Sequence, residues 1–302
     1  VIITKPKLKG LNDNKIIKRN VFEDFSEFCI HYLNKYEDIV LPNIQKSDHT
    51  NRLAVFIEFR RLPHSEVIIR NCIHQLGSEW AHIIITSNEN YLYYLSMCNE
   101  INPNIQVISF RNVKDQNDYN NLLLSKDFWD TLSCEKILIY QSDSFIFKKN
   151  IHDFLKWDYI GAPFNAKSSF ILSHEQVGNG GLSLRSKSVM IDVLNKVDLK
   201  LNLYSTEVNR YKITRKLDNF PEDIVFSQNI QTLGIGKVAG FNEAKHFSTD
   251  MVYEEDSFGM HSLWNGCNDW RDNMTKKIEN ILNHSENISE EDKSYYMETK
   301  EY

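Results

Sequence analysis

The chain has 302 residues, of which 41% are hydrophobic and 25% charged, and its 35 basic and 41 acidic side chains give a formal net charge of -6. This ordinary globular composition argues against a disordered chain, and the lack of a basic stripe argues against nucleic-acid binding. No apolar run approaches the ~20 residues that span a membrane, no signal peptide is visible, and the five scattered cysteines indicate reduced thiols, so we expect a cytoplasmic protein.

The predicted elements begin with a basic, irregular arm over residues 1–20 and a helix over Val21–Tyr36, whose apolar residues recur at helical spacing. Beyond a polar linker, short apolar runs alternate with helical patterns. We expect strands over Leu53–Phe59, Trp80–Thr86, Ile105–Phe110 and Ile137–Tyr140, and helices over Ser65–Leu76, Tyr91–Cys98 and Tyr119–Leu132. Such alternation, with strands apolar on both faces, predicts an α/β fold with a mostly parallel sheet covered by helices.

The second half of the chain is less regular. We expect helices near Ser186–Lys196 and Glu222–Leu233, a short strand near Gly236–Ala239, and an amphipathic helix around Ile278–Leu282 before a charged tail.

An acidic side chain follows the fourth predicted strand, in the segment Gln141-Ser142-Asp143-Ser144. In open parallel sheets, ligands bind beyond the carboxyl ends of the strands, so Asp143 is placed to reach one. A turn or helix cap is the structural alternative for the same residue.

A glycine-rich segment, predicted as a loop, supplies a second candidate for ligand binding: Gly178, Asn179, Gly180 and Gly181. Glycine lets the backbone approach a ligand closely, and the alternative is a flexible hairpin tip. The segment matches neither the GxGxxG nor the Walker pattern of nucleotide-binding loops.

Two acids, Glu222 and Asp223, follow Pro221 at the start of a predicted helix. A helix N-terminus favours this sequence for structural reasons alone. The functional interpretation is a general base that takes the proton of an attacking acceptor hydroxyl, held ionised by the helix dipole. Further along, His261 could join an aspartate and the diphosphate of a nucleotide around Mn²⁺ or Mg²⁺, although a single histidine is more often a packed or surface residue.

Five segments taken in order resemble a known pattern: QSDS after a strand, DYIGAPF, VGNGGLSLRS, PEDIVFS and GMHSLW. Over roughly Arg52 to Trp264, the chain resembles a family of GT-A glycosyltransferase-like proteins, known mainly as a domain of unknown function, that occurs in bacteria, eukaryotes and large DNA viruses. The resemblance implies a GT-A fold, with a Rossmann-like nucleotide-binding half and a smaller acceptor half. We therefore divide the chain into an N-terminal arm and helix (1–50), a catalytic domain (51–272, with halves 51–145 and 146–272) and a C-terminal helix and tail (273–302).

The resemblance also implies roles for particular residues. QSDS takes the place of an Asp-x-Asp motif, so that Asp143 stands at the metal-binding position while Gln141 replaces the usual first acid and Ser142 lies between them. His261 falls where a late metal-binding histidine is common. Glu222 and Asp223 fall where inverting members keep the catalytic base, and we prefer Asp223. The nucleotide-base pocket is expected to be lined by Ile57, Glu58 and Arg60.

We therefore expect an enzyme that moves a sugar from a nucleotide sugar, expected to be a UDP-sugar, to a hydroxyl of a glycan, protein or small molecule, with inversion and with Mn²⁺ or Mg²⁺. Three alternatives stay open: a retaining transferase, a nucleotidyltransferase, and an inactive nucleotide-sugar- or carbohydrate-binding module, which the missing acid at Gln141 keeps in view. The Asn-, Lys- and Ile-rich composition suggests an AT-rich genome, and hence a bacterium or a large virus, for which the host cytoplasm or the virion would be the location.

Overall fold

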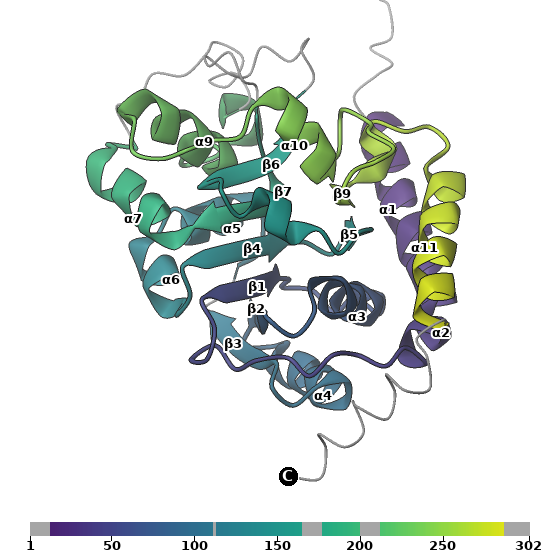
Figure 1. Ribbon diagram of the computed structural model, residues 1–302. Helices are drawn as coiled ribbons and strands as arrows, with labels where there is room; N and C mark the ends of the chain where they lie inside the picture. Colours follow the sequence, from purple (N-terminus) through teal and green to yellow (C-terminus); the bar gives the residue numbers. More distant parts are fainter. Residues whose placement is uncertain (1–12, 111–112, 165–176, 200–211, 287–302) are drawn as a thin grey trace, which may run out of the picture.

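The computed structural model describes residues 13–110, 113–164, 177–199 and 212–286 (Figure 1). Its centre is a six-stranded sheet in the order β3-β2-β1-β4-β7-β6. The strands are β1 (Arg52–Ile57), β2 (Ala81–Ser87), β3 (Gln106–Phe110), β4 (Lys136–Tyr140), β6 (Tyr159–Pro163) and β7 (Val177–Ser186). The first four are parallel, and β7 runs antiparallel to both of its neighbours. The predicted α/β fold with a mostly parallel central sheet is confirmed.

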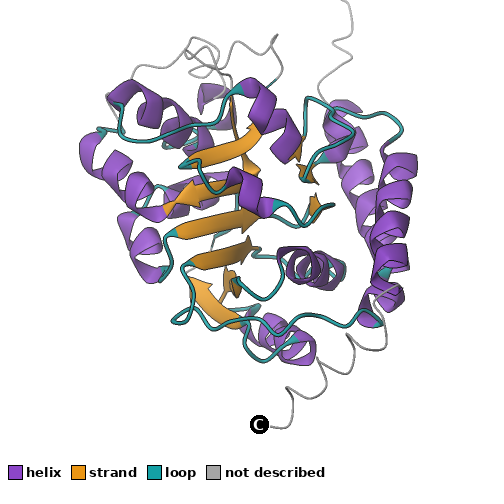
Figure 2. Ribbon diagram, viewed as in Figure 1, coloured by secondary structure: helices purple, strands orange, loops and turns teal. Residues whose placement is uncertain are grey.

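Helices cover both faces of this sheet, which gives three layers (Figure 2). One face packs against α1 (Asp13–His31), α2 (Leu33–Glu37), α3 (Ser65–Leu76), α4 (Tyr91–Ile101) and α11 (Trp270–Glu286). The other face packs against α5 (Gln116–Leu123), α6 (Lys126–Thr131), α7 (Lys187–Lys196) and α9 (Glu222–Leu233). Alternate residues of β1 enter the two cores, Phe56 on one side and Val55 on the other, which explains why the strand is apolar without a break after Arg52.

Several helix ends follow from local sequence. Helices α3 and α9 have the predicted bounds, and each ends at a glycine with positive φ: Gly77 at 75° and Gly234 at 62°. The single helix predicted over Tyr119–Leu132 is instead split into α5 and α6, because Ser125 adopts an extended conformation between them. The predicted strand near Gly236–Ala239 is reduced to one bridge, between Val238 and Tyr159.

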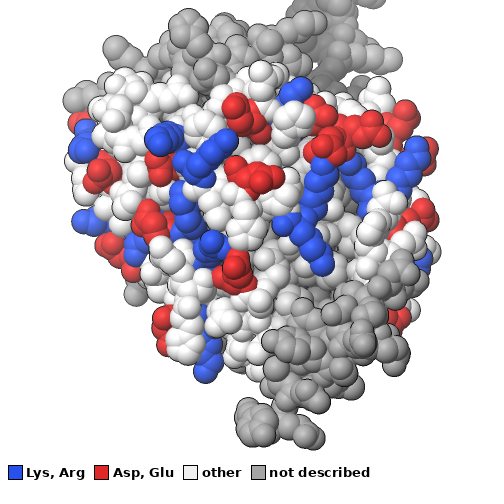
Figure 3. All heavy atoms as spheres, in the orientation of Figure 1, with Lys and Arg blue, Asp and Glu red and all other residues white. Residues whose placement is uncertain are grey.

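The two ends of the described chain meet on one side of the molecule. Phe25 of α1 and Met274 and Ile278 of α11 are fully buried in the same hydrophobic core. No helix in the described part of the chain is long and apolar enough to cross a membrane. All five cysteines fall within the described residues, and each is buried and free. On the face drawn in Figure 3, positive and negative side chains are interspersed.

A smaller sheet completes the fold beside the carboxyl ends of β1 and β4. It consists of β5 (Ser144–Ile146), β9 (Gly259–His261) and β8 (Ser248–Thr249), and it lies near the helix α10 (Phe241–Phe247). The chain runs outward from β1 through β2 to β3 and then returns to place β4 on the other side of β1. Such a switch point opens a crevice at the carboxyl ends of the strands. Because β7 is antiparallel, its first residues reach this same edge.

Candidate functional site

The end of β1 contributes a buried carboxylate to the crevice. Glu58 is 5% exposed and accepts hydrogen bonds from the backbone of Phe59 and Arg60 and from the Arg60 guanidinium. The Arg60 side chain is 60% exposed and lies over the ring of Phe22. Its guanidinium also donates to the Ser142 hydroxyl at 3.3 Å, which links the ends of β1 and β4.

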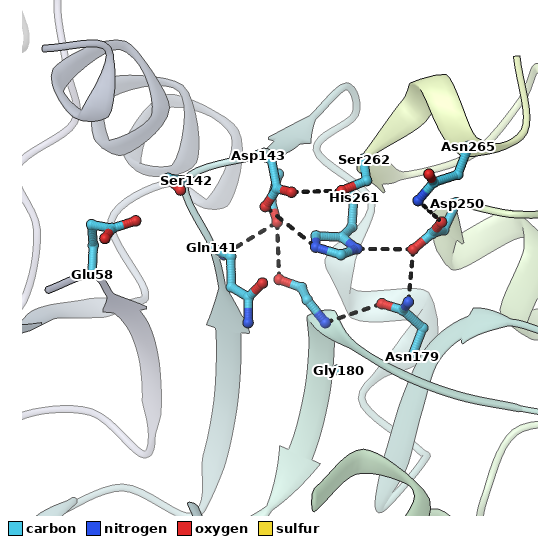
Figure 4. A network of polar contacts seen from close by, with 12 residues as sticks. Glu58, Gln141, Ser142, Asp143, Asn179, Gly180, Asp250, His261, Ser262 and Asn265 are labelled. Carbon is cyan, nitrogen blue, oxygen red and sulfur yellow. Dashed lines mark hydrogen bonds and ion pairs between the residues drawn. The ribbon is translucent and has the colours of Figure 1, made fainter. Parts of the chain in front are cut away.

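The turn after β4 holds Asp143 with its carboxylate toward the small sheet (Figure 4). Ser262 donates twice to this residue, from its backbone N–H to the Asp143 carbonyl at 2.9 Å and from its hydroxyl to Asp143 Oδ2 at 2.5 Å. Ser262 has a φ of 46°, in the left-handed region that non-glycine residues rarely adopt. Strain of this kind is concentrated at functional sites, where the surrounding structure maintains it.

His261 lies between two carboxylates. Its Nε2 is 3.3 Å from Asp143 Oδ1, and its Nδ1 is 2.9 Å from Asp250 Oδ2. Burial opposes a charged imidazole, but the charges of Asp143 and Asp250 outweigh it and raise the pKa of His261 well above its usual value. Burial likewise opposes ionisation of Asp143, but the His261 charge and the hydrogen bonds from His261 and Ser262 hold the pKa of Asp143 below its usual range.

Asp143 and His261 fit a divalent cation. Two ligands at about 2.1 Å from one ion and at a right angle stand about 3 Å apart, close to the separation of Asp143 Oδ1 and His261 Nε2. A carboxylate with an imidazole suits Mn²⁺ in particular. No three His, Cys, Asp or Glu side chains of the described residues are arranged to hold a metal by themselves, so water and the oxygens of a ligand would complete the shell.

The glycine-rich segment is not the loop that the sequence predicted. Gly178, Asn179, Gly180 and Gly181 form the first half of β7, where the register with β6 is irregular. A Cβ on Gly181 would lie 2.1 Å from His261 Cδ2, and a Cβ on Gly180 would lie 2.6 Å from a carboxylate oxygen of Glu222. The glycines are therefore required by the close approach of two side chains.

The two acids at the start of α9 have different surroundings. Glu222 is buried and forms a bidentate ion pair with the fully buried Arg185, at 2.5 and 2.9 Å. Asp223 is partly exposed, and its carboxylate accepts hydrogen bonds from the backbone N–H of Gly180 at 3.2 Å and of Ile224 at 2.8 Å. Asp223 therefore accepts from two neutral backbone groups, whereas both oxygens of Glu222 are held by the Arg185 guanidinium.

The protonation of Asp223 differs from the expectation that the helix dipole would hold it ionised. Burial and the adjacent Glu222 carboxylate raise the pKa of Asp223 to about 7, because together they outweigh the two backbone hydrogen bonds and the more distant Arg185 charge. A carboxyl with this pKa exchanges a proton readily at neutral pH, as an acid–base catalyst must.

All the site residues expected from the sequence, with the exception of Gly178, line one cleft of about 920 Å³. Gly178 lies beside it, with its carbonyl accepting a hydrogen bond from the Tyr159 hydroxyl. The expected residues that line the cleft are Ile57, Glu58, Arg60, Gln141, Ser142, Asp143, Asn179, Gly180, Gly181, Glu222, Asp223 and His261. The cleft thus brings together residues from the ends of β1 and β9, the turn after β4, the first half of β7 and the start of α9.

Sequence reasoning missed three residues of this site. Asp250 is an isolated acid with no distinguishing pattern around it, and Ser262 and Arg185 lie within the GMHSLW and VGNGGLSLRS segments, for which no role of these two residues was predicted. A buried arginine in a strand is unusual enough to require an acidic partner, and this signal could have pointed to the Arg185–Glu222 pair. For Asp250, the sequence offers no such signal.

Comparison with solved structures finds similar chains at low identity. Mouse xyloside xylosyltransferase 1 in its apo form has a TM-score of 0.45 and 10% identity, over 72% of this chain and 99% of that chain. A mannosyltransferase from Pyrobaculum calidifontis, in complex with GDP-Man and Mn²⁺, has a TM-score of 0.42 and 10% identity, over 71% of this chain and 62% of that chain. A 4-diphosphocytidyl-2C-methyl-D-erythritol synthase from Anaerococcus prevotii has a TM-score of 0.36 and 12% identity, over 57% of this chain and 85% of that chain.

Sequence comparison is more selective. No curated protein matches the chain. One family model matches residues 103–261, which begin before β3 and end at His261, and so include Asp143 in the turn after β4 and the two acids at the start of α9. This match covers more than half of the 302 residues, and the chain therefore belongs to the family described as "Protein of unknown function (DUF5672)".

Proposed function

We propose that the chain is a glycosyltransferase that moves a sugar from a nucleotide sugar, a UDP-sugar, to an acceptor hydroxyl with inversion. The observation that carries this proposal is that one cleft is lined by a carboxylate–imidazole pair suited to a metal and by a separate carboxylate with a pKa of about 7. The two centres are neighbours, because Gly181 contacts His261 and the preceding Gly180 donates to Asp223.

The donor would bind with its diphosphate toward Asp143 and His261. A Mn²⁺ or Mg²⁺ ion held by these two residues would act as a Lewis acid that stabilises the leaving diphosphate. Ile57, Glu58 and Arg60 would form the wall against the nucleotide base, and the turn at Gln141 and Ser142 would lie against the donor. The backbone of Gly180 and Gly181, which lines the cleft, would lie against the sugar.

Asp223 would then act as the general base. The acceptor oxygen attacks the anomeric carbon while the bond from that carbon to the diphosphate oxygen breaks, and the leaving diphosphate takes the electron pair. The acceptor hydroxyl's proton passes to Asp223, whose carboxylate is oriented by the backbone N–H groups of Gly180 and Ile224. One displacement of this kind inverts the anomeric configuration. Glu222, which is paired with Arg185, would position Asp223 and take no proton itself.

A screen of nucleotide sugars for donor hydrolysis and transfer, with and without EDTA, tests the proposal. We expect turnover of at least one donor, loss of turnover with EDTA, and its return on adding Mn²⁺. Donor binding without turnover would support the inactive module instead, and pyrophosphate release from a nucleoside triphosphate would support a nucleotidyltransferase. NMR of the product would distinguish inversion from retention. Full activity in EDTA would refute the metal alone, whereas no binding of any donor would refute the proposed function.

A further inference from the structure

Asp250 is a buried carboxylate to which the proposed reaction assigns no step. It follows β8 and is 1% exposed. Three side chains surround its carboxylate (Figure 4): His261 Nδ1 at 2.9 Å, Asn179 Nδ2 at 2.7 Å and Asn265 Nδ2 at 2.8 Å. A carboxylate at this depth is costly to bury unless it is fully hydrogen-bonded, as this one is.

The contact with His261 determines which ring nitrogen faces the cleft. Both oxygens of Asp250 accept a hydrogen bond from an asparagine amide, so the hydrogen that lies between His261 and Asp250 is placed on Nδ1. The opposite nitrogen, Nε2, is then directed at Asp143 and the cleft. Metal-binding histidines are commonly oriented in this way by a carboxylate behind the ring.

The contact with Asn179 links the Asp250 carboxylate to a second element, the strand β7. Asn179 donates to Asp250 and, through its Oδ1, accepts the backbone N–H of Gly181 at 3.1 Å. Gly181 in turn lies directly against His261, where a Cβ would be 2.3 Å from Nε2. Asp250 thus holds both the ring and the strand that packs on it.

We infer that Asp250 is a positioning residue, which fixes His261 with Nε2 toward the cleft and holds the Asn179–Gly181 segment of β7 against the ring. Its value for catalysis rests on the proposed function, since Nε2 is the atom proposed to bind the metal. The orientation of the ring itself does not depend on a metal and is measured separately.

The first measurement is NMR of the full chain labelled with ¹⁵N-histidine and free of metal. The His261 signals are assigned by their absence from His261→Gln. We expect a downfield Nδ1-bound proton that is protected from exchange, and its loss in Asp250→Ala. In Asp250→Asn, whose side-chain oxygen can still accept from Nδ1, we expect the signal to return. Asp256→Asn, at an exposed acid outside this network, is the matched control and should leave the signal unchanged.

The second measurement is Mn²⁺ affinity in the presence of UDP, from the free-ion signal in electron paramagnetic resonance. We expect Asp250→Ala to weaken binding about 10- to 100-fold, Asp250→Asn to restore part of it, and Asp256→Asn to have no effect. An unchanged His261 signal or unchanged Mn²⁺ affinity in Asp250→Ala would overturn the inference. If the wild-type protein binds no Mn²⁺, but Asp250→Ala still loses the Nδ1 proton signal, the proposed metal site is refuted and the positioning role of Asp250 stands.

A third measurement uses the wild-type protein alone, so that it still tests the inference if Asp250→Ala fails to fold. With Mg²⁺ and UDP added, the His261 ring must keep its proton on Nδ1. A proton found on Nε2 in place of Nδ1 would overturn the inference.

Discussion

Replacing Asp223 with asparagine should make the fold more resistant to alkaline pH while it removes the proposed base. The folded protein raises the pKa of Asp223 from 3.8 to about 7, first through burial and then through the Glu222 charge. At 1.36 kcal/mol per pH unit, this difference corresponds to about 4 kcal/mol of folding free energy.

The sign follows from which state binds the proton more tightly. The folded state does, so wild type has its full stability below the unfolded pKa of 3.8 and loses it as the pH rises to about 7. About 2–3 kcal/mol of the loss falls between pH 5 and pH 8. An asparagine side chain does not titrate, so the Asp223→Asn variant should lack this part of the pH dependence. If the new amide group at position 223 weakens the hydrogen bonds from Gly180 and Ile224, the resulting loss of stability in the variant is the same at pH 5 and pH 8.

Urea unfolding of wild type and Asp223→Asn at pH 5 and pH 8 measures how the difference in unfolding free energy between the two proteins changes with pH. Asp127→Asn is the matched control, because Asp127 is an exposed acid in the first turn of α6. The same Asp223→Asn protein should lose about 10²- to 10⁴-fold in transfer rate, and wild-type transfer should rise with pH up to about 7. A stability difference that does not change between the two pH values would refute the account of the Asp223 environment, and full transfer activity would refute its role as base.

Two further substitutions test the packing around the cleft. In Gly181→Ala the new Cβ would collide with the His261 ring, so we expect Mn²⁺ binding to be lost while the fold is retained. Gly234→Ala is the control, because its Cβ would meet no other atom. This control should lower stability alone, since Gly234 has a φ of 62°. Arg185→Met should destabilise the protein by about 3–5 kcal/mol in urea unfolding, because Glu222 is left buried without its partner, and adding Glu222→Leu should restore most of the loss. A Gly181→Ala protein with normal Mn²⁺ affinity, or an Arg185→Met protein as stable as wild type, would contradict these expectations.

The first half of the fold could be predicted because its signals are local. The strands β1, β2 and β4 are short, mostly apolar runs buried on both faces, and helices such as α3 end at a glycine that the sequence displays. Position after a strand was also sufficient to place Asp143 at the crevice, since the carboxyl ends of parallel strands meet at one edge.

The second half could not be predicted to the same depth, because its contacts join distant segments. The GNGG sequence indicates freedom of the backbone, yet the glycines are part of a strand and are required by His261 and Glu222, which lie far along the chain. The division of the chain at residues 50 and 272 stays a prediction, and Phe25 and Met274 share one core with the central sheet.

The glutamine at position 141 need not weaken a metal site. An Asp-x-Asp motif offers two negative charges, and here Asp143 and Asp250 together supply two, one facing the cleft and one behind the His261 ring. These two negative charges therefore balance a divalent cation, even though position 141 has no acid. If so, Gln141→Asp adds a carboxylate that no cation neutralises, in the cleft where the donor diphosphate would bind. We expect this variant to weaken UDP binding and to improve Mn²⁺ affinity by less than about threefold, both measured by calorimetry. A gain of tenfold or more would show that the site lacks a charge that Asp250 does not provide.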